Sequence, residues 1–338
     1  MTVEHDADLA PHTTFRVPAR AKALARFSTV DDLRQLLATP ELKDLSRLIL
    51  GGGSNVLFTH DWPGVVLLNE LPGVAVVHED GAHVWLKAGA GVPWHELVMH
   101  TVERGWGGLE NLSLIPGKVG AAPMQNIGAY GVELKDHFAA LEALKIDDGT
   151  VVTFRPDDCR FGYRESFFKR EGRDRFVILN VTFRLHKHPV LSTGYGAIRD
   201  VLAERGITAP TVRDISDAVV HIRRSKLPDP AVLGNAGSFF KNPIVPVALA
   251  DRIKSAHPGA PVYPAGDGQA KLAAGWLIEQ AGWKGHRDGA CGVHDRQALV
   301  LVNHGGATGR DVFDLSERIL RDMQARFGVE LEREVNIL

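Results

Sequence analysis

The sequence predicts a protein of mixed helices and strands with at least two domains, and two observations support this prediction. The chain has 338 residues, whereas one domain averages roughly 150, so the length predicts two domains or three. Strand and helix patterns alternate over the first third of the chain, a run of strands follows, and helical patterns then dominate. A chain of this length buries enough surface to fold without disulfides or metals.

The composition excludes several classes of protein. Apolar residues make up 44% and charged residues 24%, close to globular averages, which excludes a disordered chain. Subtracting 41 acidic from 39 basic residues leaves a net charge of −2, so no electrostatic surface for nucleic acid or an anionic membrane is expected. Segment 1–12 has no apolar stretch, and no run reaches the ~18 apolar residues of a membrane span. We therefore expect a cytoplasmic protein without a signal peptide.

Cysteine and histidine usage indicates neither a disulfide framework nor a metal centre. Cys159 and Cys291 form no CxxC motif and no cluster with zinc spacing, which favours a reducing compartment. Cys291 is expected to be a small buried residue rather than a nucleophile. His294 could ligate a metal, but no second histidine or cysteine stands at ligand spacing, so no metal site is expected.

Local patterns place the main elements. Thr29 is expected to cap a helix that begins at Val30, with Asp32 completing a capping box. Asp148-Gly149 predicts a hairpin turn, and segment 186–210, rich in Pro, Gly, Thr and His, is interpreted as a linker. Strands are predicted at 48–50, 65–68, 74–77, 84–86, 177–185 and 298–302, and helices at 94–102, 215–224, 247–256, 272–280 and 312–327.

The first motif is the run Leu48 to Leu57, in which a strand leads into Gly51, Gly52 and Gly53, followed by Ser54 and Asn55. Consecutive backbone N–H groups in such a turn can form a concave site for a phosphate. The run is not a Rossmann fingerprint, because Val56 replaces the third glycine, and it is not a P-loop, because no Gly-Lys-Ser/Thr follows. An ordinary glycine turn explains its composition equally well.

The second motif is the small-residue run Ile115 to Gly131, with Gln125 and Asn126 as its only amides. Small residues let the backbone approach a flat ligand closely, although a tightly packed loop is the simpler reading of this run alone.

Three further features carry candidate chemistry. Arg160 and Arg164 are four residues apart, on one face if the segment is helical, and an arginine beside aromatic residues suits a carboxylate or phosphate. Ser238 stands between a glycine and two phenylalanines, a plausible setting for a proton donor, although an isolated serine is usually structural. Alternation in the expected last strand would point Glu330, Glu332 and Glu334 to one face.

Taken together, these motifs resemble the UDP-N-acetylenolpyruvoylglucosamine reductases, flavoenzymes of peptidoglycan synthesis. The resemblance covers roughly 15–335, and the order and spacing of seven segments make it specific. The segments are LILGGGSNVL (48–57), GLENLSLIPGKVGAAPMQNIGAYGVEL (108–134), CRFGYRES (159–166), KLPDP (226–230), GNAGSFFKNP (234–243), KLAAGWLIEQ (271–280) and HDRQALVLVN (294–303). Tyr195, in Thr193-Gly-Tyr-Gly196, resembles the subtype with an extra tyrosine loop over the substrate.

The resemblance implies an FAD-binding domain of the vanillyl-alcohol-oxidase type in two α+β lobes, followed by an α/β substrate-binding domain. The implied ranges are lobe one at 1–70, lobe two at 71–190, a linker with the tyrosine loop at 191–210, the substrate-binding domain at 211–330, and a terminal strand at 331–338 that returns to the active site.

The resemblance also implies roles for single residues. It assigns Ser238 as the general acid, with Arg164 and Glu334 flanking the substrate carboxylate. The residues implied to bind FAD are Gly51, Gly52, Gly53, Ser54, Asn55, Gly117, Gly120, Gln125, Asn126 and Gly128. The positions implied to bind substrate are Tyr130, Tyr195, Lys226, Asn242 and Gln297.

The implied reaction reduces an enolpyruvyl ether to a lactyl ether, with non-covalent FAD supplying the hydride and NADPH as co-substrate. Two other functions stay open: a flavin oxidase of the same fold, and a non-catalytic module that binds a UDP-sugar or flavin. Oxidases of this fold often attach FAD through His or Cys, and the glycine-rich segments contain neither.

Overall fold

The computed structural model describes residues 2–338, which form two compact units. The first unit comprises 2–7, 21–52 and 63–225, and the second comprises 8–20, 53–62 and 226–338. Both contain helices and strands, as the predicted α+β class requires. Among residues 2–338, no helix is both long enough and apolar enough to cross a membrane.

The first unit begins with a four-stranded sheet. In spatial order its strands are β1 (Val3–Asp8), β2 (Arg20–Phe27), β5 (Trp62–Asn69) and β3 (Arg47–Leu50), and β3 and β5 are parallel. Helices α1 (Val30–Ala38) and α2 (Pro40–Lys43) connect β2 to β3. The predicted capping box is confirmed, because Thr29 and Asp32 exchange side-chain-to-backbone hydrogen bonds at the start of α1.

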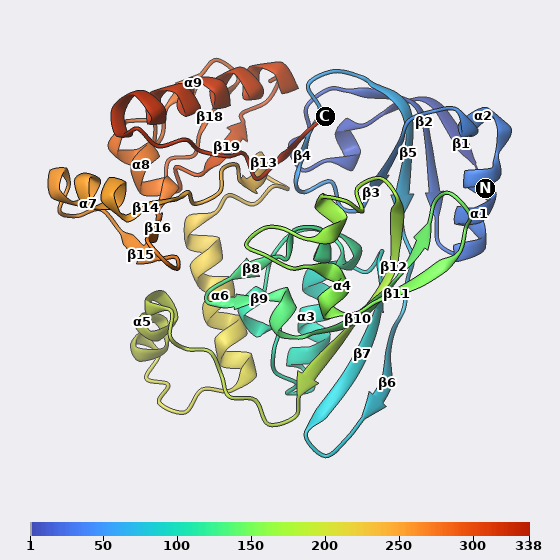
Figure 1. Ribbon diagram of the computed structural model, residues 1–338, viewed down its shortest axis with the longest axis horizontal. Helices are drawn as coiled ribbons and strands as arrows, with labels where there is room; N and C mark the ends of the chain where they lie inside the picture. Colours follow the sequence, from blue (N-terminus) through green and yellow to red (C-terminus); the bar gives the residue numbers. More distant parts are fainter. Residues whose placement is uncertain (1) are drawn as a thin grey trace. The chain divides into compact units, whose positions relative to one another are not determined.

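A five-stranded antiparallel sheet forms the second part of this unit (Figure 1). Its strands in spatial order are β11 (Val151–Phe154), β10 (Phe138–Lys145), β12 (Phe176–His186), β7 (His83–Gly89) and β6 (Val74–Glu79). The predicted Asp148-Gly149 hairpin joins β10 to β11. Helix α3 (Trp94–Val102) matches its predicted range, and its Trp94 is buried in the same core as Phe183 of β12.

The first unit also contains several short elements. They are η2 (Glu110–Leu112), η3 (Val119–Ala121), η4 (Pro123–Gln125), β8 (Gly128–Ala129), β9 (Val132–Glu133), η5 (Leu134–Asp136), α4 (Pro156–Cys159) and η6 (Phe167–Lys169).

The segment predicted as a linker contains a helix. Helix α5 (Gly196–Glu204) lies beside α6 (Val212–Lys226), and the two share a buried apolar cluster (Figure 1). The linker prediction missed this helix because its flanks are rich in turn-forming residues.

The second unit contains two small antiparallel sheets, besides the parallel pair of β4 (Val56–Leu57) and β20 (Asn336–Ile337). The first has the order β13 (Gly234–Ser238), β19 (Val300–Asn303), β18 (Cys291–Val293) and β17 (Arg287–Asp288). The second has the order β14 (Ile244–Pro246), β16 (Gln269–Leu272) and β15 (Val262–Pro264). The remaining elements are η1 (Ala10–His12), α7 (Val247–Ala256), α8 (Ala274–Gln280) and α9 (Gly309–Phe327).

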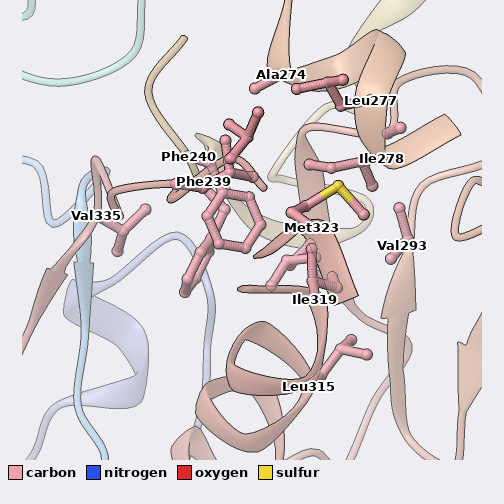
Figure 2. Close-up of a cluster of buried hydrophobic side chains, with 14 of the residues drawn as sticks. Phe239, Phe240, Ala274, Leu277, Ile278, Val293, Leu315, Ile319, Met323 and Val335 are labelled. Carbon is pink, nitrogen blue, oxygen red and sulfur yellow. The ribbon is translucent and has the colours of Figure 1, made fainter. Parts of the chain in front are cut away.

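One apolar core joins these elements. Leu315, Ile319 and Met323, from one face of α9, are buried with Leu277 and Ile278 of α8 (Figure 2). Phe239 and Phe240 enter the same core, so the backbone that follows β13 is fixed by two large buried rings.

Two local predictions were wrong. Arg160 and Arg164 do not share a helix: α4 ends at Cys159, and both arginines have left-handed backbones, with φ of 46° and 56°. Segment 330–334 is not a strand, since only an isolated bridge pairs Arg333 with Phe240.

The compact units also differ from the predicted domain ranges. Segments 8–20 and 53–62 lie in the same unit as 226–338, partly because β4 pairs in parallel with β20. Nearly all of α6 lies in the first unit, because its apolar face packs against α5.

Candidate active site and cofactor-binding loops

Within the first unit, the two glycine-rich motifs are neighbours. A Cβ atom on Gly52 would lie 3.0 Å from the Cα of Gly117, closer than an ordinary contact, so the neighbouring backbone would have to shift. A Cβ on Gly51 would lie 3.5 Å from the Cβ of Lys118, an ordinary contact distance. Two segments selected only for their composition therefore form one structure, in which backbone approaches backbone closely.

Lys118 adds a positive charge to these loops. Its Nζ donates to the carbonyl of Asn69 at 2.9 Å, and burial lowers its pKa, an effect that the Glu70 carboxylate opposes. The sequence analysis did not select this residue, because it described the second motif only by its small residues and its two amides.

Gly53 and Asn55 belong to the second unit. Gly53 has a φ of +58°, and a Cβ there would lie 2.0 Å from the carbonyl oxygen of His12, so the protein's own backbone requires glycine. Asn55 contacts the carboxyl-terminal segment, because its Nδ2 donates to the backbone carbonyl of Glu334 at 3.2 Å. Its own backbone carbonyl accepts from the backbone N–H and from the side-chain Nδ2 of Asn336. Ser54, between them, is half-buried.

The rest of the second motif mixes close approach with internal hydrogen bonding. Gly120 packs on Ala90, where an added Cβ would lie 2.6 Å away. Asn126 is fully buried, and its Nδ2 donates to Glu133 and to the Gly162 carbonyl, both at 3.0 Å. Its Oδ1 accepts from the Lys135 N–H at 3.0 Å. With three such bonds inside the protein, Asn126 shapes the loop, whereas neighbouring Gln125 is only half-buried.

Arg164 is fixed against the second motif. Its guanidinium donates to the carbonyl of Gly128 at 2.7 Å and lies over the Tyr163 ring, 5.2 Å from the centroid. Its φ of +56° is uncommon for a non-glycine residue. A strained backbone and an aromatic contact together hold a cation in a defined place, as expected of a functional arginine.

In the second unit, Ser238 ends β13 directly after a bulge. The pairing of β13 with β19 shifts between Asn235 and Ser238, and Gly237, with a φ of +69°, supplies the left-handed residue. Ser238 is half-buried, whereas the following Phe239 is 0% exposed. Ser238 thus follows a left-handed glycine and precedes two buried phenylalanine rings.

Glu334 lies beside this serine along the backbone. Its N–H donates to the carbonyl of Phe239 at 2.8 Å, so the strand end and the carboxyl-terminal segment are joined at residue 239. Glu334 is half-buried, and Glu330 and Glu332 are exposed. Lys241 pairs with Glu332 at 2.7 Å, which accounts for one of these carboxylates without any role in a site.

Two predicted substrate residues meet at the start of α8. The Oδ1 of Asn242 accepts from the N–H of Ala274 at 3.0 Å and thus caps the helix from outside. A Cβ on Gly275 would lie 3.0 Å from the Oε1 of Gln297, which places that amide against the same turn. Residues 242 and 297 are therefore neighbours in the fold.

The other predicted substrate residues gather near α6. The rings of Tyr130 and Tyr195 pack edge to face with centroids 5.2 Å apart, and Tyr195 precedes α5. Arg223, which the sequence analysis passed over, hydrogen-bonds Tyr130 and donates through Nε to the Leu114 carbonyl at 3.2 Å. Burial raises the pKa of Tyr130 and lowers that of Arg223. Lys226, at the end of α6, is exposed.

Arg223 could have been found from helical periodicity. It follows Val219 by four positions, and Val219 lies on the buried face of α6, so position 223 is expected beside that face.

Two cavities, of about 600 and 390 Å³, lie along α9 and contain none of the predicted site residues. Arginines line both, but Arg310, Arg318 and Arg326 each pair with an aspartate within 3.0 Å, so little charge remains for a ligand. Both cysteines are buried, and desolvation raises the pKa of Cys159 to about 12 and that of Cys291 to about 11. The prediction that Cys291 is a small buried residue is confirmed.

Comparison with known proteins identifies the family. A model of the FAD-binding domain matches residues 21–155, and a model of the UDP-N-acetylenolpyruvoylglucosamine reductase carboxyl-terminal domain matches residues 229–338. The UDP-N-acetylenolpyruvoylglucosamine reductase of Burkholderia orbicola strain MC0-3 is 55% identical over 97% of this chain and 95% of its own length. This chain belongs to the UDP-N-acetylenolpyruvoylglucosamine reductase family.

Other relatives of the reductase family agree. The reductase of Chromobacterium violaceum is 52% identical, over 98% of both chains. The crystal structure of the Thermus caldophilus reductase covers 100% of this chain and 99% of its own, with a TM-score of 0.69 and 26% identity. A 6-hydroxy-D-nicotine oxidase from Arthrobacter nicotinovorans, with a TM-score of 0.55 and 15% identity, shares the fold alone. The predicted FAD-binding fold class is thereby confirmed.

The residues of this reductase-family chain fit FAD. The approach of Gly52 to Gly117 leaves backbone, rather than side chains, at the surface of both loops, and Lys118 supplies a nearby positive charge. Backbone N–H groups and a cation suit a pyrophosphate. The prediction of FAD is therefore confirmed by the family and agrees with the loop geometry.

Proposed function

We propose that this protein catalyses the NADPH-dependent, FAD-mediated reduction of UDP-N-acetylglucosamine enolpyruvate to UDP-N-acetylmuramate, a cytoplasmic step of peptidoglycan synthesis, and that it is of the tyrosine-loop subtype. The observation that carries this proposal is the junction in the second unit. There the Glu334 N–H bonds to the residue after Ser238, and the Glu334 carbonyl bonds to Asn55 of the first glycine motif. A candidate acid, a carboxylate and a cofactor loop thus share one backbone network.

FAD, when bound, supplies the hydride chemistry of the reaction. Residues 51–55 hold its pyrophosphate, and the Gly117, Gly120, Gln125 and Gly128 positions line its pocket. Asn126 acts indirectly, because its hydrogen bonds fix the loop from inside.

Ser238 holds the proton that is delivered to the substrate carbon. The bulge at Gly237 exposes the serine at the end of its strand, and Phe239 and Phe240 exclude water from behind it. Arg164 stabilises the negative charge that develops on the substrate carboxylate, and its contacts with Gly128 and Tyr163 hold it ready before substrate arrives. Glu334 hydrogen-bonds at the same carboxylate.

The remaining residues bind the nucleotide portion of the substrate. Tyr195 and Lys226 hold its diphosphate, and Tyr130, Asn242 and Gln297 are further substrate-binding positions. Binding energy at these remote groups orients the enolpyruvyl group.

The test separates the two half-reactions. Ser238→Ala should leave flavin reduction by NADPH near the wild-type rate and slow flavin reoxidation by the enolpyruvyl substrate about 10²–10⁴-fold, the usual contribution of a positioned acid. Ser238→Cys should recover part of that rate, since a thiol also donates a proton. Ser255→Ala, an exposed serine on α7, is the matched control and should change neither rate. Reoxidation of Ser238→Ala at the wild-type rate, measured by stopped flow, excludes this serine as the acid.

The same preparation decides between the other functions. Unmodified FAD released by denaturation contradicts a covalently flavinylated oxidase, and slow reoxidation of the NADPH-reduced protein in air contradicts any oxidase. A folded protein without flavin would overturn the proposed function.

A further inference from the structure

Asn111 makes an unusual pair of contacts in the first unit. It lies in η2, is 1% exposed, and its Nδ2 donates to two carbonyls at 3.0 Å each, those of Tyr130 and Ser192. These carbonyls lie 19 and 81 residues further along the chain. One amide group thus joins the second glycine motif to the segment that leads into Tyr195.

The direction of the amide is fixed by chemistry. If it were flipped, Oδ1 would face two carbonyl oxygens, and three acceptors cannot pair with one another. The oxygen instead points where no partner exists within residues 2–338. A buried, unpaired acceptor destabilises a fold. The side chain therefore satisfies its two N–H donors while its oxygen is left without a partner.

The two acceptors belong to residues that already meet through their side chains. Tyr130 has a left-handed backbone, with φ of +50°, and its ring packs edge to face on Tyr195, three residues after Ser192. Tyr195 is 49% exposed, so the protein covers only half of it. The amide of Asn111 supplies a fixed point close to this half-exposed side chain.

We propose that Asn111 is a positioning residue for substrate binding: it holds the 191–195 segment against Tyr130, so that Tyr195 is already placed for the UDP portion of the substrate. This rests on the proposed function, which assigns Tyr195 to the substrate. Without the two bonds, the segment samples other conformations, and affinity falls by the fraction of molecules that keep the competent one.

The test uses Asn111→Leu, which keeps the branched shape of the side chain and removes both donors. We expect the Kd for UDP-N-acetylmuramate, measured by calorimetry, and the KM for the enolpyruvyl substrate to rise about tenfold, with FAD content and flavin reduction by NADPH unchanged. Ser113→Ala is the matched control: it removes a buried hydroxyl of the same turn, bonded to Ser216 at 2.8 Å, and should leave Kd and KM unchanged.

A double-mutant cycle shows whether Asn111 acts through Tyr195. In a Tyr195→Ala background, Asn111→Leu should have little further effect on Kd. Additive effects, or an unchanged Kd and KM in the single variant, overturn the inference. If Asn111→Leu does not fold, Asn111→Ser, with one donor, replaces it in the same cycle. A wild-type protein that binds the nucleotide but does not turn over contradicts the proposed function alone.

Discussion

The turn at Gly53 and the strand end at Gly237 both lie in the second unit, and both need glycine for a left-handed backbone, with φ of +58° and +69°. Their surroundings differ. A Cβ at Gly53 would overlap the backbone of His12 and Thr13, whereas a Cβ at Gly237 meets nothing within 4 Å in the described part of the chain. Gly53 is needed for packing as well as conformation, and Gly237 for conformation alone.

The difference shows that glycine content has more than one cause. At Gly53 the fold itself requires a residue without a side chain. From the sequence motif alone, this glycine would be explained by the approach of a ligand. At Gly237 the space is open, and the glycine serves to place the next residue, Ser238. Substitutions can separate these causes.

The largest effect is expected from Gly53→Ala. A methyl group 2.0 Å from a backbone oxygen cannot be accommodated without moving residues 12–14, and the left-handed backbone adds strain. We expect a loss of about 3–5 kcal/mol in the free energy of unfolding, measured by urea titration.

Alkylation of the two cysteines can show which unit unfolds first in such a variant. Their raised pKa values, about 12 for Cys159 and about 11 for Cys291, leave little thiolate at pH 8, so both should resist alkylation in the native protein. In Gly53→Ala, Cys291 of the second unit should react before Cys159 of the first. The reverse order would place the damage in the first unit.

A smaller effect is expected from Gly237→Ala. With open space around the new methyl group, only the left-handed backbone is disfavoured, at a cost of about 1–2 kcal/mol. The fold should persist, but a displaced Ser238 should slow reoxidation of the flavin by substrate about 10²-fold. An enzyme with reduced stability and normal reoxidation would show that the bulge does not position the serine.

Gly52→Val examines the contact between the two motifs. Its Cβ would crowd the Cα of Gly117 at 3.0 Å and push the loops apart. FAD affinity should fall about tenfold while the second unit stays intact, which FAD titration and Cys291 labelling can each measure.

The smallest effect is expected from Gly51→Ala, the control for the series. Its Cβ would lie 3.5 Å from that of Lys118, an ordinary contact. Stability should change by less than about 0.5 kcal/mol. A large loss would mean that this glycine, rather than Gly53, limits the turn.

Much of the fold could be predicted because it follows local patterns. The period of apolar residues gave the range of α3, and a four-residue capping pattern gave the start of α1. Arg160 and Arg164 were misplaced because a spacing of four is meaningful only inside a helix, and α4 ends one residue earlier. Nothing in the local sequence signals the left-handed backbone that both adopt.

The site was predictable in its parts but not in its connections. Ser238 and the glycine motifs were recognised from composition and resemblance, because their neighbours in sequence define their surroundings. Asn111, Lys118 and Arg223 were missed because their partners, Ser192, Asn69 and Tyr130, are 49 to 93 positions away in the sequence. Such contacts exist only after the chain has folded.

The pairing of β4 with β20 has a consequence for biosynthesis. Asn55 and Asn336 are 281 residues apart, so a ribosome adding roughly 5–20 residues per second needs about 14–56 seconds to make the second partner after the first. During that interval Leu57 and Phe58, each 1% exposed in the finished fold, have no completed core to enter. The nascent chain therefore exposes a short apolar segment during most of its synthesis. A chaperone that binds apolar stretches would be expected to bind near residue 57.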